Sequence, residues 1–188
     1  VGTGALGTET KGSRNIAIGE NALLAQNNTT ASSPYNVAIG YNSGKAITTG
    51  LLNTLVGGLA GDAITSGNSN VAIGYDSLNF TTSTDSYNTA VGYAAGLSIT
   101  TGIENTIIGG LAGDALTDAD YNVAIGSSAL TTDTLGSKST AIGVGTLENQ
   151  NFTTATDSFN TAVGFFAGRA VTTGTSNTLI GALAGDAI

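Results

Sequence analysis

The chain of 188 residues contains no cysteine, histidine, methionine or tryptophan, and only 10% of its residues are charged, well below the roughly 25% of an ordinary soluble domain. Its 13 acidic residues outnumber 5 scattered basic ones, which argues against a nucleic-acid partner. No run of about 18 apolar residues is present to cross a membrane, yet 40% hydrophobic residues are too many for a disordered linker.

A five-residue phrase, Asn-x-x-[Ile/Val]-Gly, recurs along the chain, and positions are counted here from its first residue. Most phrases start about 17 residues after the one before, and a fixed period of this size predicts a solenoid. Insertions lengthen three intervals, slightly after Asn70 and more after Asn15 and Ser139. We therefore expect residues 1–188 to form a single repeat array of about eleven coils that starts and ends in mid-repeat, as a piece of a longer chain. The phrases begin at Asn15, Asn36, Asn53, Asn70, Asn88, Asn105, Asn122, Ser139, Asn160 and Asn177.

Three kinds of coil alternate in chain order. Those that begin at 36, 88 and 160 carry an aromatic residue after the glycine and end in Thr-Thr-Gly. Each is followed by a second kind, at 53, 105 and 177, that contains Leu-Ala-Gly-Asp-Ala. The third kind has leucine at position nine and contains all the insertions, including those at 26–35 and 149–159. Function tends to lie on loops over rigid scaffolds, so these two inserted loops are the best places for specificity.

Each phrase predicts one short strand, because Ile, Val and Thr alternate at positions two and four and a glycine follows at position five. A second glycine near position fifteen indicates a second strand-length piece and another turn. The predicted fold is therefore an all-β parallel solenoid or roll with coils of about 17 residues. We expect positions two and four to face its thin core. The alanine at position three would then face outward, toward a neighbouring chain in a homotrimeric fibre.

The phrases "NVAIG", "NTAVG" and "STAIG" resemble the head repeats of trimeric autotransporter adhesins. The longer unit "NTAVGYAAGLSITTG", at 88–102, is even more similar to Asn-Thr-Ala-[Ile/Val]-Gly arrays of phage tail fibres. The resemblance covers essentially the whole chain and implies a trimeric extracellular fibre of parallel β-rolls. Adhesin head coils usually run shorter than the coils of this chain, and this difference favours the tail-fibre type of array.

The asparagines at position one are candidates for either a binding row or a structural ladder. In stacked coils, repeated asparagines usually bond to one another and to turn backbone, so we expect a structural ladder. The predicted ladder residues are Asn15, Asn36, Asn53, Asn70, Asn88, Asn105, Asn122, Asn160 and Asn177.

Three aspartates, Asp62, Asp114 and Asp186, occupy the repeated Leu-Ala-Gly-Asp-Ala segment and suggest calcium. They stand roughly three and four coils apart, so they cannot share an ion within one chain. A turn-capping role is the better interpretation, and an ion held between chains stays open. We expect no metal or cofactor site.

Adjacent threonines recur seven times, as at Thr48-Thr49 and Thr172-Thr173, and a flat threonine ladder would suit ice binding. Neighbours on a strand point to opposite faces, so each such pair offers only one outward hydroxyl. Strand propensity and turn bonding explain most of these pairs.

Aromatic residues after the glycine could stack on sugars of a receptor, although packing between coils or chains explains them more simply. The candidate surface residues are Tyr41, Tyr75, Tyr93 and Phe165.

Catalysis has few suitable groups, because without His and Cys the usual nucleophile–base pairs are absent. Glycan cleavage by paired acids is a remaining rival, but no acidic pair repeats. We therefore expect a non-enzymatic, extracellular structural segment of a phage tail fibre or bacterial surface adhesin. Its partner would be further copies of itself, and a cell-surface glycan or receptor is a further possible partner. The alternative is a monomeric ice-binding or glycan-binding solenoid.

Overall fold

The structure is a computed structural model that describes residues 2–28, 32–79 and 86–186. The fold is all-β and forms a parallel β-solenoid, as predicted, and none of the described residues is helical. Ten strands, one per coil, form a single sheet whose order follows the chain. They are β1 (Ile16–Ile18), β2 (Val37–Ile39), β3 (Thr54–Val56), β4 (Val71–Ile73), β5 (Thr89–Val91), β6 (Thr106–Ile108), β7 (Val123–Ile125), β9 (Thr140–Ile142), β11 (Thr161–Val163) and β12 (Thr178–Ile180).

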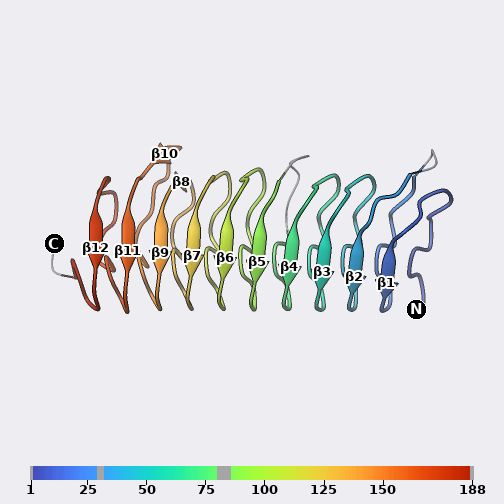
Figure 1. Ribbon diagram of the computed structural model, residues 1–188, viewed down its shortest axis with the longest axis horizontal. Coiled ribbons are helices and arrows are strands. Elements are labelled where there is room, and N and C mark those ends of the chain that lie inside the picture. Colours follow the sequence, from blue (N-terminus) through green and yellow to red (C-terminus); the bar gives the residue numbers. More distant parts are fainter. Residues whose placement is uncertain (1, 29–31, 80–85, 187–188) are drawn as a thin grey trace.

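The strands stand side by side along a rod, with β1 near one end and β12 near the other (Figure 1). Each strand pairs in parallel with the next, position for position, so that Ile16 lies beside Val37 and Val163 beside Ile180. The register is unchanged across the coils that contain insertions, including the two long coils, 15–35 and 139–159. The insertions therefore lie outside the sheet, where they do not shift the register and so do not move strand side chains from one face to the other.

The interior of the coil contradicts the predicted orientation of the strands. The residue at position three is fully buried in every strand of the large sheet from β2 to β11, whereas positions two and four are half-buried or exposed. Alanine thus faces the core, and the β-branched pair faces outward. The reason is space, because leucine and isoleucine side chains from the rest of the coil already fill the interior.

Large aliphatic side chains fill the centre of the rod, one per coil from either position nine or position twelve, and Leu55 and Ile107 add a second one at position three of their coils. When position nine is glycine, the aliphatic residue is at position twelve, as in Ile47 and Ile64. When position nine is leucine, as in Leu130 and Leu147, position twelve is polar. A Cβ on Gly61, at position nine, would lie 2.8 Å from the side chain of Ile64 at position twelve. The two arrangements therefore exclude each other by volume.

The glycine at position five is required by the spacing of the coils. Gly40 has a φ of 142°, and a Cβ there would lie 2.2 Å from the carbonyl oxygen of Gly57 in the next coil. The same close approach recurs from coil to coil, which explains why this glycine never varies in the phrase.

The prediction of a second strand in each coil is largely wrong. Within the described ranges it occurs once as a strand pair, β8 (Gly136–Ser137) with β10 (Thr156–Asp157), and once as the isolated bridge between Gly12 and Ser32. Both lie at the long coils. In the other coils single hydrogen bonds between turns, such as that from the Thr48 amide to the Thr65 carbonyl (2.9 Å), connect this side of the rod.

No helix in the described part of the chain is long and apolar enough to span a bilayer.

Candidate functional site

The asparagines at position one stand in a buried column beside the sheet. The Asn53 carboxamide oxygen accepts the backbone N–H of Asn70 at 3.0 Å and its side-chain N–H at 3.1 Å, while its own side-chain nitrogen donates to the Gly67 carbonyl at 2.8 Å. Equivalent bonds connect Asn88 with Asn105. Apart from the side-chain nitrogen of Asn15, which is buried without a partner, these amides bond to one another and to turn backbone, so they offer no binding row at the surface.

The outer face of the sheet, made of positions two and four of the ten strands, contains only Ile, Val and Thr. Position four includes Ile39, Ile73, Ile108 and Ile142, whose exposed fractions are 36–39%. Parallel sheets are normally covered on both faces. One face of this sheet is therefore uncharged, largely apolar and uncovered in the single chain.

Position two contributes a row of outward-facing hydroxyl groups that the sequence analysis did not identify, because it placed this position in the core. The six threonines of this row are Thr54, Thr89, Thr106, Thr140, Thr161 and Thr178. By contrast, the Thr-Thr pairs are partly engaged in the turns, since the Thr48 and Thr100 hydroxyls donate to carbonyls of the next coil at 3.3 and 3.4 Å.

The four predicted surface aromatics, all at position six, are exposed by 52–60%. Tyr75 and Tyr93, from adjacent coils, stack with ring centroids 6.0 Å apart and planes 8° from parallel. The ring of Phe165 lies against that of Phe166, with centroids 4.2 Å apart, and Tyr41 is also at the surface. A second aromatic row, at the residue before the asparagine, includes Tyr35, Tyr87, Tyr121 and Phe159, exposed by 46–56%.

Within the described part of the single chain, the three repeated aspartates lie apart from other acidic clusters. No three Asp or Glu side chains of the described residues come together as a metal site would require. Asp114 accepts the hydroxyl of Thr131 at 2.6 Å. Burial raises the pKa of the Asp62 carboxyl, and the neighbouring charge of Asp76 acts in the same direction, against an opposing effect of Lys45.

Sequence reasoning missed a buried polar network behind each of the two long coils. Gln150, fully buried, donates to the Asp133 carboxylate at 2.6 Å and to the Ser139 hydroxyl at 2.8 Å, and accepts from Asn160 at 2.8 Å. Gln26 occupies the equivalent place in the other coil. The available signal was the exchange between positions nine and twelve, where leucine at nine accompanies a polar residue at twelve.

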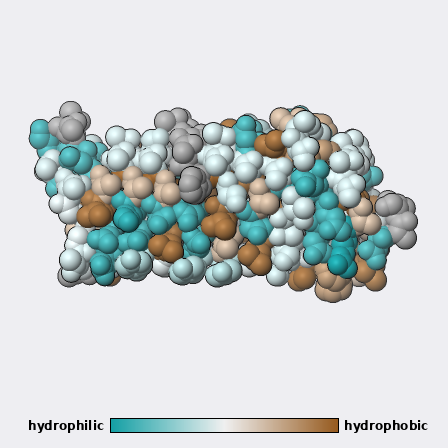
Figure 2. All heavy atoms as spheres, turned by 180° about the vertical axis from the view of Figure 1, so that it is seen from behind, coloured by the Kyte–Doolittle hydropathy of each residue, from teal (hydrophilic) through white to brown (hydrophobic). Residues whose placement is uncertain are grey.

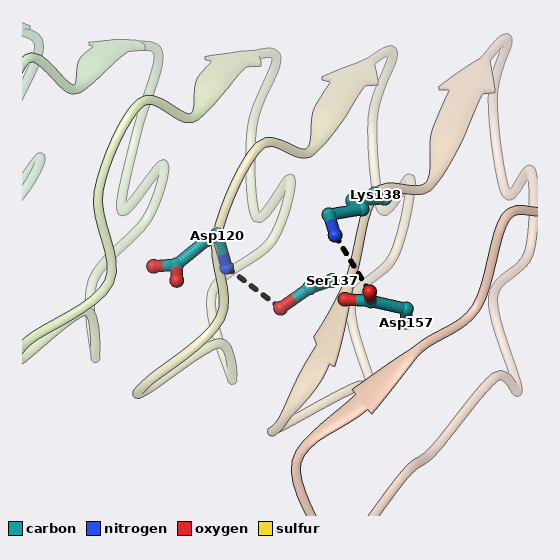
Figure 3. A network of polar contacts seen from close by, with 4 residues as sticks. All are labelled: Asp120, Ser137, Lys138 and Asp157. Carbon is teal, nitrogen blue, oxygen red and sulfur yellow. Dashed lines mark hydrogen bonds and ion pairs between the residues drawn. The ribbon is translucent and has the colours of Figure 1, made fainter.

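Near the second long coil, side chains on the surface join neighbouring turns (Figure 3). Lys138 points toward Asp157, with the ammonium 2.6 Å from the carboxylate, and the amide of Asp120 donates to the Ser137 hydroxyl at 3.0 Å. The exposed ion pair contributes little to stability, so these contacts connect the turns beside the β8–β10 pair without fixing it strongly.

The view of the rod from behind shows no comparable apolar band among the described residues. In Figure 2 hydrophobic residues appear there as separate groups among hydrophilic ones.

A shallow hollow of about 450 Å³ is lined by Tyr87 and Glu104. The described lining contains one carboxylate, whereas glycan cleavage needs two.

Comparison with known proteins finds no relative, since no family model, no curated protein and no solved structure matches the chain.

Proposed function

We propose that the chain is a non-catalytic structural segment of an extracellular fibre, of the phage tail-fibre or bacterial adhesin kind, and that its outer face packs against copies of itself in a homotrimer. The observation that carries the proposal is the uncharged β-branched outer face of a ten-stranded parallel sheet. In the trimer, positions two and four lie at the axis, and the alanine at position three stays inside each coil.

The size of this face supports the proposal. Nine strand spacings make it roughly 45 Å long, and the six residue steps from one aromatic row to the other make it roughly 20 Å wide. Its area is therefore on the order of 900 Å² per chain, close to the roughly 800 Å² that each partner buries in a stable interface. A second copy also repeats the same strand spacing, so its β-branched rows can interdigitate along the whole length.

Light scattering on a size-exclusion column tests the proposal directly. The trimer has a mass of about 55 kDa, three times the chain mass of 18.4 kDa. Ile73→Asp together with Ile108→Asp places two charges on the outer face and is expected to leave a folded monomer, because both side chains are 37–39% exposed in the single chain. The matched control Thr49→Asp, on an exposed turn, leaves the trimer intact. A wild-type monomer contradicts the proposal.

A monomeric ice-binding role is the second candidate, and the specific observation that favours it is the row of outward threonines at position two. These threonines, interrupted by Val71 and Val123, present hydroxyl and methyl groups on one face of the chain, and such a surface can order water. Thermal hysteresis of a monomeric wild-type protein, abolished by Thr89→Lys with Thr106→Lys, supports this role over the fibre. The two functions use the same face, so a stable trimer argues against ice binding.

A further inference from the structure

The row of side chains at position six contains one open step, next to an aromatic pair that is already ordered. Along the rod the residues at this position are Tyr75, Tyr93, Gly110 and Ser127, one per coil. The Tyr75 ring covers the preceding glycine, since a Cβ on Gly58 would lie 3.5 Å from it. The other side of Tyr75 faces Tyr93, and the two rings stack.

The far side of the Tyr93 ring is uncovered. A Cβ built on Gly110 would have no heavy atom within 4 Å other than its chain neighbours, and Tyr93 is the most exposed of the four aromatic residues in this row, at 60%. The next side chain in the row, Ser127, stands two coils beyond Tyr93, roughly 10 Å away. A flat sugar ring fits a gap of this size, between an aromatic face and a hydroxyl group.

Charge selects the class of ligand. No lysine or arginine occurs between Lys45 and Lys138, and the chain has a net charge of −8. A phosphorylated or otherwise anionic ligand would find no counter-charge near Tyr93. A neutral sugar can place the apolar C–H face of its ring on tyrosine and its hydroxyl groups toward serine and turn backbone.

We propose that the step formed by Tyr93, Gly110 and Ser127 binds one neutral pyranose ring of a glycan. The Tyr75–Tyr93 stack holds the ring-binding face in place before the sugar arrives, so little side-chain freedom is lost on binding. The site belongs to the surface of one chain and does not require the trimer, so failure of either proposal leaves the other to be judged by its own test.

Binding is measured by tyrosine fluorescence, which is not masked because the chain has no tryptophan, and by saturation-transfer NMR. The probes are methyl β-D-glucopyranoside, methyl β-D-galactopyranoside and maltohexaose, with adenosine as a competing flat ligand. Wild-type protein is expected to bind at least one sugar saturably, in roughly the millimolar range of a single stacked ring.

Gly110→Tyr is the decisive variant, because it fills the gap without removing Tyr93, and the coils of Tyr75 and Tyr93 already accept tyrosine at this position. Both Gly110→Tyr and Tyr93→Ala are expected to weaken sugar binding by about tenfold or more. The matched control Tyr41→Ala, in the same row but remote from the gap, stays within about twofold. Circular dichroism verifies that each variant keeps the wild-type fold.

Two outcomes overturn the proposal. One is the absence of saturable binding to every sugar, including the case in which adenosine alone binds. The other is sugar binding that Gly110→Tyr leaves within about twofold of wild type, which would place the ligand elsewhere on the rod.

Discussion

The two long coils, 15–35 and 139–159, are equal in length and lie beside matching chains of an acid, a glutamine and an asparagine, in which the glutamine and the asparagine are buried. In the first copy Gln26 donates to Glu9 at 3.2 Å and accepts from Asn36 at 3.1 Å. In the second, Gln150 makes the same two contacts, to Asp133 and from Asn160, at 2.6 and 2.8 Å.

The copies differ in how completely their polar groups are satisfied. The side-chain nitrogen of Asn15 and the hydroxyl of Ser32 are buried without a hydrogen-bond partner. At the matching places in the second copy, the Ser139 hydroxyl bonds to that of Ser158 at 2.5 Å and the Thr156 hydroxyl donates to a carbonyl at 2.9 Å. Buried polar groups are therefore paired more completely in the second long coil than in the first, and we expect the second to be the more stable one.

Substitution of the acids Asp133 and Glu9 should give the largest difference in the free energy of unfolding between the two long coils. Asp133 is fully buried, and Asp133→Leu removes one acceptor from the Gln150 side chain and the acceptor of the backbone amides of Gly136 and Phe152. We expect a loss of about 3 kcal/mol in the free energy of unfolding. Glu9→Leu should cost clearly less, because the donors around the partly exposed Glu9 can reach water. Urea unfolding of both variants measures this, and equal losses would contradict the comparison.

The pH dependence of stability gives a second difference. Burial acts to raise the pKa of Glu9, but hydrogen bonds from Gly12, Asn28 and Lys11 outweigh it and lower the pKa from 4.5 to about 2. This lowered pKa stabilises the fold fully above pH about 4.5, and the contribution disappears as pH falls toward 2. The stability gap between wild type and Glu9→Gln should narrow over that window. Unfolding midpoints at a series of pH values verify it, and a constant gap would be the contrary result.

Ser139 and Ser158 of the second long coil correspond to Asn15 and Pro34 of the first, and placing serines at both positions should reproduce the hydrogen bond between their hydroxyls. The Asn36 amide donates to Asn15 at 3.0 Å, whereas the Asn160 amide donates to Ser158 at 3.3 Å. Asn15→Ser alone removes the acceptor and should destabilise. Adding Pro34→Ser supplies the missing hydroxyl and should restore about 1 kcal/mol. A double-mutant cycle measures this coupling, and simple additivity of the two substitutions would argue against it.

The smallest expected difference concerns the cations that pair with an aromatic ring in each copy. The Arg14 guanidinium lies 5.5 Å from the centre of the Tyr35 ring, and the Lys138 ammonium 5.4 Å from that of Phe159. Lys138 also pairs with Asp157. Arg14→Met and Lys138→Met should each cost less than about 1 kcal/mol. Only the loss at Lys138 should shrink clearly in high salt, as thermal unfolding at two salt concentrations would reveal.

The sequence alone determined the period, the strand positions and the parallel all-β solenoid. The repeat interval and the invariant glycine are local properties of each coil, and Gly40 demonstrates that its backbone must pass within contact distance of the next coil. The recurrence of asparagine at position one of each phrase likewise led to the prediction of a structural ladder.

Only the tertiary structure decided which way the strands face. Alternation places Ala38 opposite Val37 and Ile39 but does not say which side is inside, since that depends on the volume that Ile47 or Leu23 already occupies. The buried pairing of Gln150 with Asp133 and the open step beside Tyr93 follow likewise from contacts between coils. Hydrophobic pattern is a property of one strand, whereas inside and outside are properties of the packed rod.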